Sequence, residues 1–207
     1  MLDGEDSGMF RALSQPDALP AELLPDADAQ TEWWYYAGHL VAGGRRFAFH
    51  FSYFRRRCDG MRVAGLFPVS FLHRHIRFAH LSFTDAEGGS FPYAQRRFPG
   101  PGSFGAGESG SGLGLRIGPW GIDADVRCHR LRAGMRGLEL DLELTPDKPL
   151  VRHGGLDGMT RKGGGAVSRH VSLPRMSVSG TVMLGCERMA ATGDSWMDHK
   201  QGSFVLS

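Results

Sequence analysis

The chain has 207 residues, of which 41% are hydrophobic and 30 are glycines. This length is sufficient for one β domain of ordinary size, and the glycine content is typical of many turns between short strands rather than of long helices. The 24 basic and 22 acidic residues give a formal net charge of +2, which provides no electrostatic reason to expect a nucleic acid or an anionic membrane surface as a partner.

The three cysteines, Cys58, Cys128 and Cys186, are odd in number and too far apart for a disulfide framework or a CxxC metal site. The N-terminus is acidic and lacks the basic and apolar regions of a secretory signal. No apolar run is long enough to span a bilayer. We therefore expect a cytoplasmic protein without stable membrane insertion.

Residues 1–30 are predicted to form an N-terminal arm. Pro16, Pro20 and Pro25 break any long helix in this segment, because proline removes a backbone donor and clashes with the preceding turn. One helical turn is expected near residues 21–24. The arm leads directly into the most informative stretch of the chain.

That stretch, residues 31–54, consists of two aromatic-rich runs that flank Gly43-Gly44, a pattern that predicts a β-hairpin. The alternation of side chains along a strand places the residues of the first run on two faces. One face carries Glu32, Trp34 and Tyr36, and the other carries Trp33, Tyr35 and His39. Because both faces carry aromatics, one should pack in the core and the other should line a second apolar surface, either a cavity or a partner domain.

Further strands are predicted within residues 71–85, 113–117, 138–144, 176–184 and 189–192, with long loops at 99–112 and 146–165. The run 138–144 alternates leucine with acidic residues, which indicates a strand with one solvated face. Many short strands with regular turn signals predict an all-β fold, either a lipocalin-like antiparallel barrel or a curled sandwich.

Four motifs in order then resemble a known family. They are Glu-Trp-Trp-Tyr-Tyr-Ala-Gly-His-Leu at 32–40, Ala-His-Leu-Ser-Phe-Thr-Asp at 79–85, the segment 142–154, and Gly-Asp-Ser-Trp-Met-Asp-His at 193–199. Together they resemble the carotenoid 1,2-hydratase (hydroxyneurosporene synthase) and AttH-like family of lipocalin-type proteins, over roughly residues 32–203.

The resemblance implies two tandem lipocalin-like β domains. On this basis we expect residues 31–192 to form the first domain and residues 193–207 to begin a second domain that is truncated. An exposed sheet edge left by truncation should pair with something. We therefore expect a homodimer or a companion chain that supplies the second domain.

The hydratases of this family add water across a terminal double bond of an acyclic carotenoid. Such a reaction needs a proton donor, an environment that stabilises a carbocation, and a positioned water. The resemblance implies Asp198 as the general acid, with Glu32 or His199 positioning the water. The side chains expected to bind the hydrophobic substrate are Trp33, Trp34, Tyr36, His39 and Trp196. On a strand, Asp198 would share a face with Trp196, and His199 would point the other way.

This chain departs from the family pattern after Asp198-His199, where it reads Lys200-Gln201-Gly202 in place of the usual Glu-Trp-Gly. A second departure is Val167-Ser168-Arg169-His170, which replaces a tyrosine-rich segment. The first change replaces an acid by a base and removes an aromatic beside the expected site. These departures leave a purely structural role open, in which Asp198 and His199 tie down a turn or a domain junction and Glu32 is a buried hydrogen-bond partner.

Other functions also remain open at this point. The chain could be a non-catalytic binder of a hydrophobic ligand, a Diels–Alderase-like cyclase as in some fungal relatives, or an inactive truncated homologue. A metal site of His73, His75 and His80 is disfavoured, because His80 falls on the opposite strand face from the other two. We expect no metal and no cofactor, and a hydrophobic small molecule as substrate.

Overall fold

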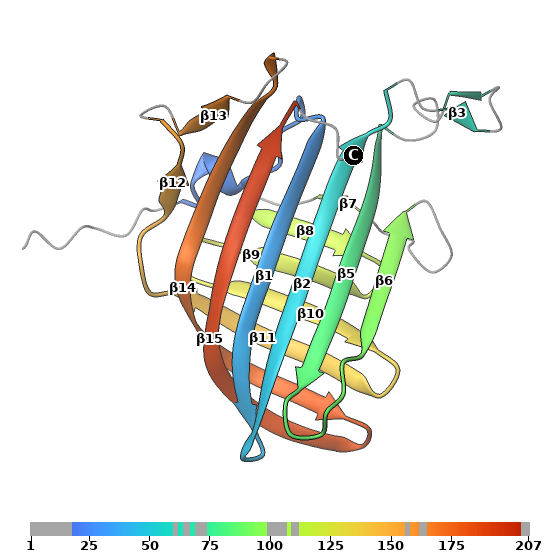
Figure 1. Ribbon diagram of the computed structural model, residues 1–207, viewed down its shortest axis with the longest axis vertical. Coiled ribbons are helices and arrows are strands. Elements are labelled where there is room, and N and C mark those ends of the chain that lie inside the picture. The colour runs from blue at the N-terminus through green and yellow to red at the C-terminus, as the bar shows by residue number, and fades with distance from the viewer. Residues whose placement is uncertain are drawn as a thin grey trace, which may run out of the picture.

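Fifteen strands and one short helical turn make up the part of the chain that the computed structural model describes, residues 18–59, 62–63, 67–68, 74–98, 107–108, 112–155, 158–161 and 165–203 (Figure 1). The elements are η1 (Ala21–Leu23), β1 (Thr31–Ala42), β2 (Arg45–Arg57), β3 (Arg62–Val63), β4 (Phe67–Pro68), β5 (His75–Asp85), β6 (Tyr93–Phe98), β7 (Gly107–Glu108), β8 (Leu113–Ile117), β9 (Trp120–Ala124), β10 (His129–Met135), β11 (Leu138–Pro146), β12 (Val151–His153), β13 (Met159–Arg161), β14 (Val167–Leu184) and β15 (Glu187–Gly202).

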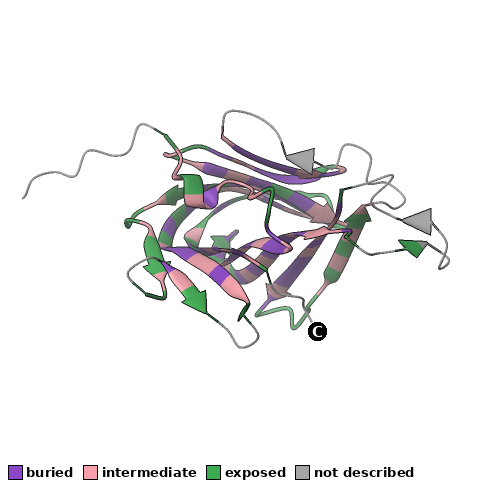
Figure 2. Ribbon diagram, turned by 90° about the horizontal axis from the view of Figure 1, so that it is seen from above, coloured by how far each residue is buried: buried purple, intermediate pink, exposed green. Residues whose placement is uncertain are grey.

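Thirteen of these strands form one antiparallel sheet, in the order β6-β5-β2-β1-β15-β14-β11-β10-β9-β8-β7, with β12 and β13 both paired to β14. Figure 1 shows the long strands β14, β15, β1, β2 and β5 crossing in front of β8–β11. Seen along the long axis, the sheet curls into a nearly closed barrel (Figure 2). The prediction of an all-β, lipocalin-like architecture is confirmed.

The aromatic hairpin forms as predicted. Gly43 and Gly44 have φ values of 56° and 75°, the left-handed conformation that a two-residue hairpin turn requires. β1 and β2 pair along their length, with Trp34 opposite Tyr53. The inward apolar side chains of both strands, Trp34 and Tyr53 among them, are 0–3% exposed and fill the interior of the barrel. The packed-core half of the two-face prediction is therefore confirmed.

The boundary expected after residue 192 falls inside a strand. β15 is continuous from Glu187 to Gly202 and pairs with β1 on one side and β14 on the other. The described residues 193–203 therefore belong to the barrel sheet, and a second domain beyond them stays a prediction. A Cβ at Gly193 would lie 1.9 Å from the carbonyl oxygen of His39, so glycine is needed for the close approach of two strands.

The described part of the N-terminal arm, residues 18–30, packs against the core of the barrel. The helical turn expected near residues 21–24 is present as η1, and Leu23 is 1% exposed. The indole Nε1 of Trp34 donates a hydrogen bond to the carbonyl oxygen of Leu23, at 2.9 Å. Residues 1–17 lie outside the described part of the chain. Residues 71–73, the first three of the strand predicted at 71–85, also lie outside it.

Within the described ranges, no helix has the length and apolarity needed to cross a membrane.

Candidate functional site

The alternation of β1 and β15 divides the predicted site residues between the two faces of the barrel wall. Glu32, Trp34, Tyr36 and His199 point inward, and each is no more than 1% exposed. The outer face carries Trp33, His39, Trp196 and Asp198. The prediction that Asp198 shares a face with Trp196 and that His199 points away is confirmed.

This division changes the expected site. Asp198 cannot act on one substrate together with Glu32 and His199, and Trp34 and Tyr36 cannot line a pocket around it, because the sheet lies between the two sets. The register shows the same arrangement, since Asp198 is paired with Tyr35, and His199 with Trp34.

The inward set forms a buried polar network. Nε2 of His199 lies 2.9 Å from Oε1 of Glu32, and the other carboxylate oxygen forms an ion pair with the Arg55 guanidinium at 2.6 Å. Nδ1 of His199 donates to the carbonyl oxygen of Glu22 at 2.5 Å, and its ring stacks on Trp34 at 4.5 Å. The network ties the N-terminal segment to the barrel, and the expectation of Glu32 as a buried hydrogen-bond partner is confirmed.

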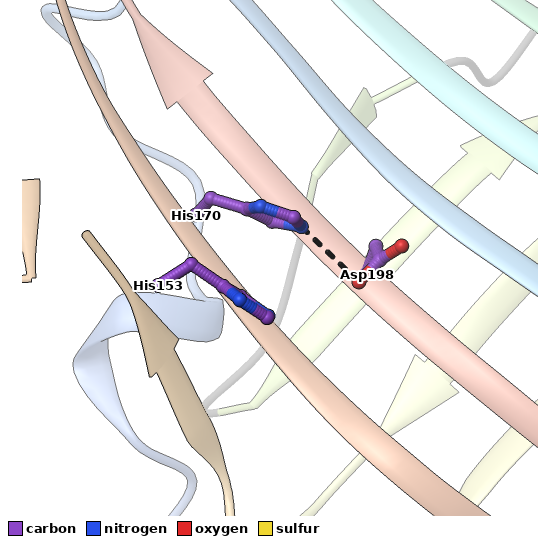
Figure 3. Close-up of side chains that lie close together, drawn as sticks. All are labelled: His153, His170 and Asp198. Carbon is purple, nitrogen blue, oxygen red and sulfur yellow. Dashed lines mark hydrogen bonds and ion pairs between the residues drawn. The ribbon is translucent and has the colours of Figure 1, made fainter. Parts of the chain in front are cut away.

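The outward Asp198 lies in a second polar cluster, built from three neighbouring strands (Figure 3). Nε2 of His170 on β14 lies 3.1 Å from Oδ1 of Asp198, and the hydroxyl of Ser172 donates to the same oxygen. On the other side of β14, Nε2 of His153 from β12 lies 2.7 Å from the Ser172 oxygen. The imidazole rings of His153 and His170 stack at 4.2 Å.

The register of the sheet produces this cluster. His153 is paired with His170 across β12 and β14, and Ser172 is paired with Asp198 across β14 and β15. Burial lowers the pKa of His170 and outweighs the Asp198 carboxylate, which acts in the opposite direction. His170 is therefore neutral near pH 7 and can accept a proton.

An aromatic surface, which we call the aromatic face, continues from this cluster across the outside of β1, β2 and β5. It consists of Trp33, Tyr35, His50, Phe54, Phe78 and His80. The rings contact one another in sequence: Trp33 and Phe54 at 5.9 Å, and Phe54 and Phe78 at 4.7 Å in a stacked pair.

The side chains of the aromatic face cover one another, and all are half-buried although they lie outside the barrel. Burial lowers the pKa values of both His50 and His80. The ammonium of Lys200 lies over the Trp33 ring, 5.7 Å from its centroid. The prediction that the second face would be aromatic rather than simply solvated is confirmed, and whether a cavity or a partner covers it stays a prediction.

Sequence reasoning assigned no role to His153, His170 or Ser172. His170 and Ser172 alternate on one face of β14, which is a visible signal, but their closeness to Asp198 depends on the pairing of two strands. The disfavoured metal site at His73, His75 and His80 is not assembled by the described residues: His73 lies outside them, and His75 and His80 alternate to opposite faces of β5.

The comparisons with known proteins agree with this architecture. The family model described as AttH-like matches residues 12–207. No curated protein sequence matches the chain. A crystal structure of an AttH protein from Nitrosomonas europaea is similar with a TM-score of 0.72 at 24% identity, over 91% of this chain and 56% of that one.

The crystal structure of kievitone hydratase from Nectria haematococca is similar with a TM-score of 0.67 at 14% identity, over 94% of this chain and 55% of that one. The chain thus spans little more than half the length of either protein. At these identities the likeness shows the fold.

Proposed function

The chain belongs to the AttH-like family, and from this premise we propose that it is a hydratase-like protein that adds water to a carbon–carbon double bond of an apolar substrate on the outer face of its barrel. The observation that carries the proposal is the position of Asp198, hydrogen-bonded within a cluster of imidazole and hydroxyl groups beside the aromatic face. The likeness in fold to a protein named as a hydratase supports the reaction class.

The proposed reaction begins with Asp198 in its protonated form, which transfers the proton to one carbon of the double bond. Hydrogen bonds from Ser172 and His170 stabilise the carboxylate that forms. The carbocation left on the other carbon is stabilised by aromatic faces, for which Trp33 and Trp196 are the outward candidates.

Water then attacks the carbocation, and its proton passes to Nδ1, the unprotonated nitrogen of neutral His170. Nε2 of His170 gives its own proton to Oδ1 of Asp198 across their 3.1 Å separation, and proton exchange of the imidazole with solvent restores the starting tautomer. Under this proposal Asp198 keeps the role of general acid. His199 and Glu32 act in the buried network instead of in catalysis.

The substrate class is an apolar isoprenoid or a related hydrophobic molecule, and an acyclic carotenoid is one member. The barrel interior does not offer the space for it near β1 and β2, since Trp34, Tyr36, Phe51 and Tyr53 are each 0% exposed there. The aromatic face, with Trp196 41% exposed beside it, supplies an apolar surface instead.

We also propose that a second copy or a companion chain covers the aromatic face. The supporting observation is an aromatic surface on the outside of the barrel, with Trp196 41% exposed beside it. Native mass spectrometry of the purified protein should show two chains or a companion. A monomer at micromolar concentration with no bound polypeptide would contradict this part of the proposal.

The reaction is tested by incubating the protein with an acyclic carotenoid and with a shorter acyclic isoprenoid alcohol in ¹⁸O-labelled water. We expect a product whose new hydroxyl group contains one ¹⁸O atom from the labelled water. Asp198→Asn should lower turnover by about 100-fold or more, because the amide cannot deliver the proton. The matched control is Asp194→Asn, an exposed carboxylate on the same strand and face.

A non-catalytic binder of a hydrophobic ligand is the second candidate, favoured by the extent of the aromatic face. It predicts co-purified ligand without labelled product. Labelled product whose rate is unchanged by Asp198→Asn would contradict the role of Asp198.

A further inference from the structure

His153, His170 and Asp198 present two imidazoles and one carboxylate from three neighbouring strands (Figure 3). We propose that these three side chains bind one divalent transition-metal ion of the zinc type. One ligand atom from each residue lies within 4.8 Å of those from the other two. Two nitrogens and one carboxylate oxygen are a ligand set that Zn²⁺ and its neighbours in the first transition row accept, with a further position left for water.

The distances are close to those of a metal site. With bonds of about 2.0–2.1 Å, neighbouring ligand atoms of a tetrahedral zinc lie about 3.3 Å apart. Nε2 of His170 and Oδ1 of Asp198 are already 3.1 Å apart. His153 needs the larger adjustment: its ring, which is held by a hydrogen bond to Ser172 and by stacking on His170, must turn from Ser172 toward the ion.

The backbone fixes the three ligands independently of any ion. His153 and His170 are directly paired across β12 and β14, and Asp198 faces Ser172 across the next pair of strands. Both imidazole rings are directed toward Asp198 (Figure 3). A site on paired strands is pre-organised, so little conformational entropy is lost when the ion binds.

The surroundings also fit a bound cation. Ser172 donates to the Asp198 carboxylate, and such outer hydrogen bonds orient a metal-ligating carboxylate. The side chains of His170 and Asp198 are 28% and 25% exposed, so water can reach the remaining position. Lys200 lies on the same face, and its positive charge disfavours a bound cation. Its ammonium, however, is placed over the Trp33 ring.

The metal site goes beyond the proposed hydration and does not depend on it. The two share Nε2 of His170 and Oδ1 of Asp198, so an ion there would hold the groups that the hydration uses to move a proton. Where the proposed function holds, the metal-loaded protein should therefore be inactive and chelator should restore turnover.

Binding is tested on tag-free, chelator-treated protein by titration with Co²⁺, followed by visible absorption, and with Zn²⁺, followed by calorimetry. One ion per chain is expected. His153→Ala and His170→Ala should each weaken binding by tenfold or more. The matched control His80→Ala removes a half-buried histidine on the same outer surface and should leave binding unchanged.

A measurement on the unmodified protein guards against variants that do not fold. Zn²⁺ should shift the imidazole ¹⁵N resonances of two histidines, assigned to His153 and His170, by nuclear magnetic resonance. The absence of stoichiometric binding, binding that survives both alanine substitutions, or shifts confined to other histidines would overturn the site. Turnover by the metal-free protein is a separate readout, so failure of the hydration and failure of the metal site are distinguishable.

Discussion

His129, one of the buried histidines, should make the stability of this protein depend steeply on pH. His129 is 1% exposed, and its Nδ1 lies 2.9 Å from the hydroxyl of Tyr36. Burial lowers the pKa of His129 from 6.5 to about 4. We expect a variant without this imidazole, His129→Asn, to lose much of the pH dependence of unfolding that the parent protein shows.

The sign follows from the direction of the shift. The unfolded chain binds the proton with a pKa near 6.5, and the folded chain only near 4, so acid favours the unfolded state. The contribution of neutral His129 to the free energy of unfolding is fully present above pH 6.5 and is lost as the pH falls toward 4. Between these two pKa values the folded state loses about 3 kcal/mol in total, and about 2 kcal/mol of it is lost between pH 7.5 and pH 5.

The assay is urea unfolding followed by tryptophan fluorescence at pH 7.5, 6 and 5. Other groups titrate in this range, so the informative quantity is the difference between the two proteins. The parent should lose about 2 kcal/mol more than His129→Asn over this interval. His39→Asn, which replaces an exposed histidine, should keep the parent's pH dependence. Parallel curves for the parent and His129→Asn would refute the reasoning.

Two further predictions concern the wall of the barrel. Glu32→Gln leaves Arg55 and His199 buried without the carboxylate that both contact, so it should lower the free energy of unfolding by about 3–5 kcal/mol in urea titrations at neutral pH. Gly193→Ala places a Cβ 1.9 Å from the carbonyl oxygen of His39, so the β1–β15 pair must separate, and a loss of about 2–3 kcal/mol is expected in the same titration.

Each has a control at an exposed position of the same sheet. Glu139→Gln removes an outward carboxylate, and Thr192→Ala changes the residue beside Gly193, and both should alter stability by less than about 0.5 kcal/mol. If Glu32→Gln lowers the free energy of unfolding no more than its control does, the buried network does not stabilise the protein in solution. If Gly193→Ala lowers it no more than its control does, β1 and β15 do not approach each other this closely in solution.

Much of the fold was predictable because its signals are local. The turn at Gly43-Gly44 depends on two consecutive residues, and the alternation of residues 138–144 follows from one strand lying on a core. The continuity of β15 was missed because its inward positions after Gly193 include Ser195, His199 and Gln201, whose polarity interrupts the apolar pattern.

The site was predictable only in part, for a non-local reason. Alternation correctly separates Asp198 from His199 and Trp33 from Trp34. It cannot say which residues of β15 lie on the same side of the sheet as Trp33 or Trp34, since this depends on the pairing register of β1 and β15. The partners His153 and His170 are distant from Asp198 in sequence, and only the register of β12, β14 and β15 brings them together.

The position of β1 also bears on how the protein is made. β1 is the first strand of the described chain, yet it pairs along its whole length with β15, the last one. On the ribosome, the aromatic hairpin of residues 31–57 emerges while its partner strand has not been synthesised. Pairings of such high contact order form slowly, and exposed apolar strands aggregate meanwhile. Production of this chain should therefore depend on chaperones that hold the hairpin until Gly202 has left the exit tunnel.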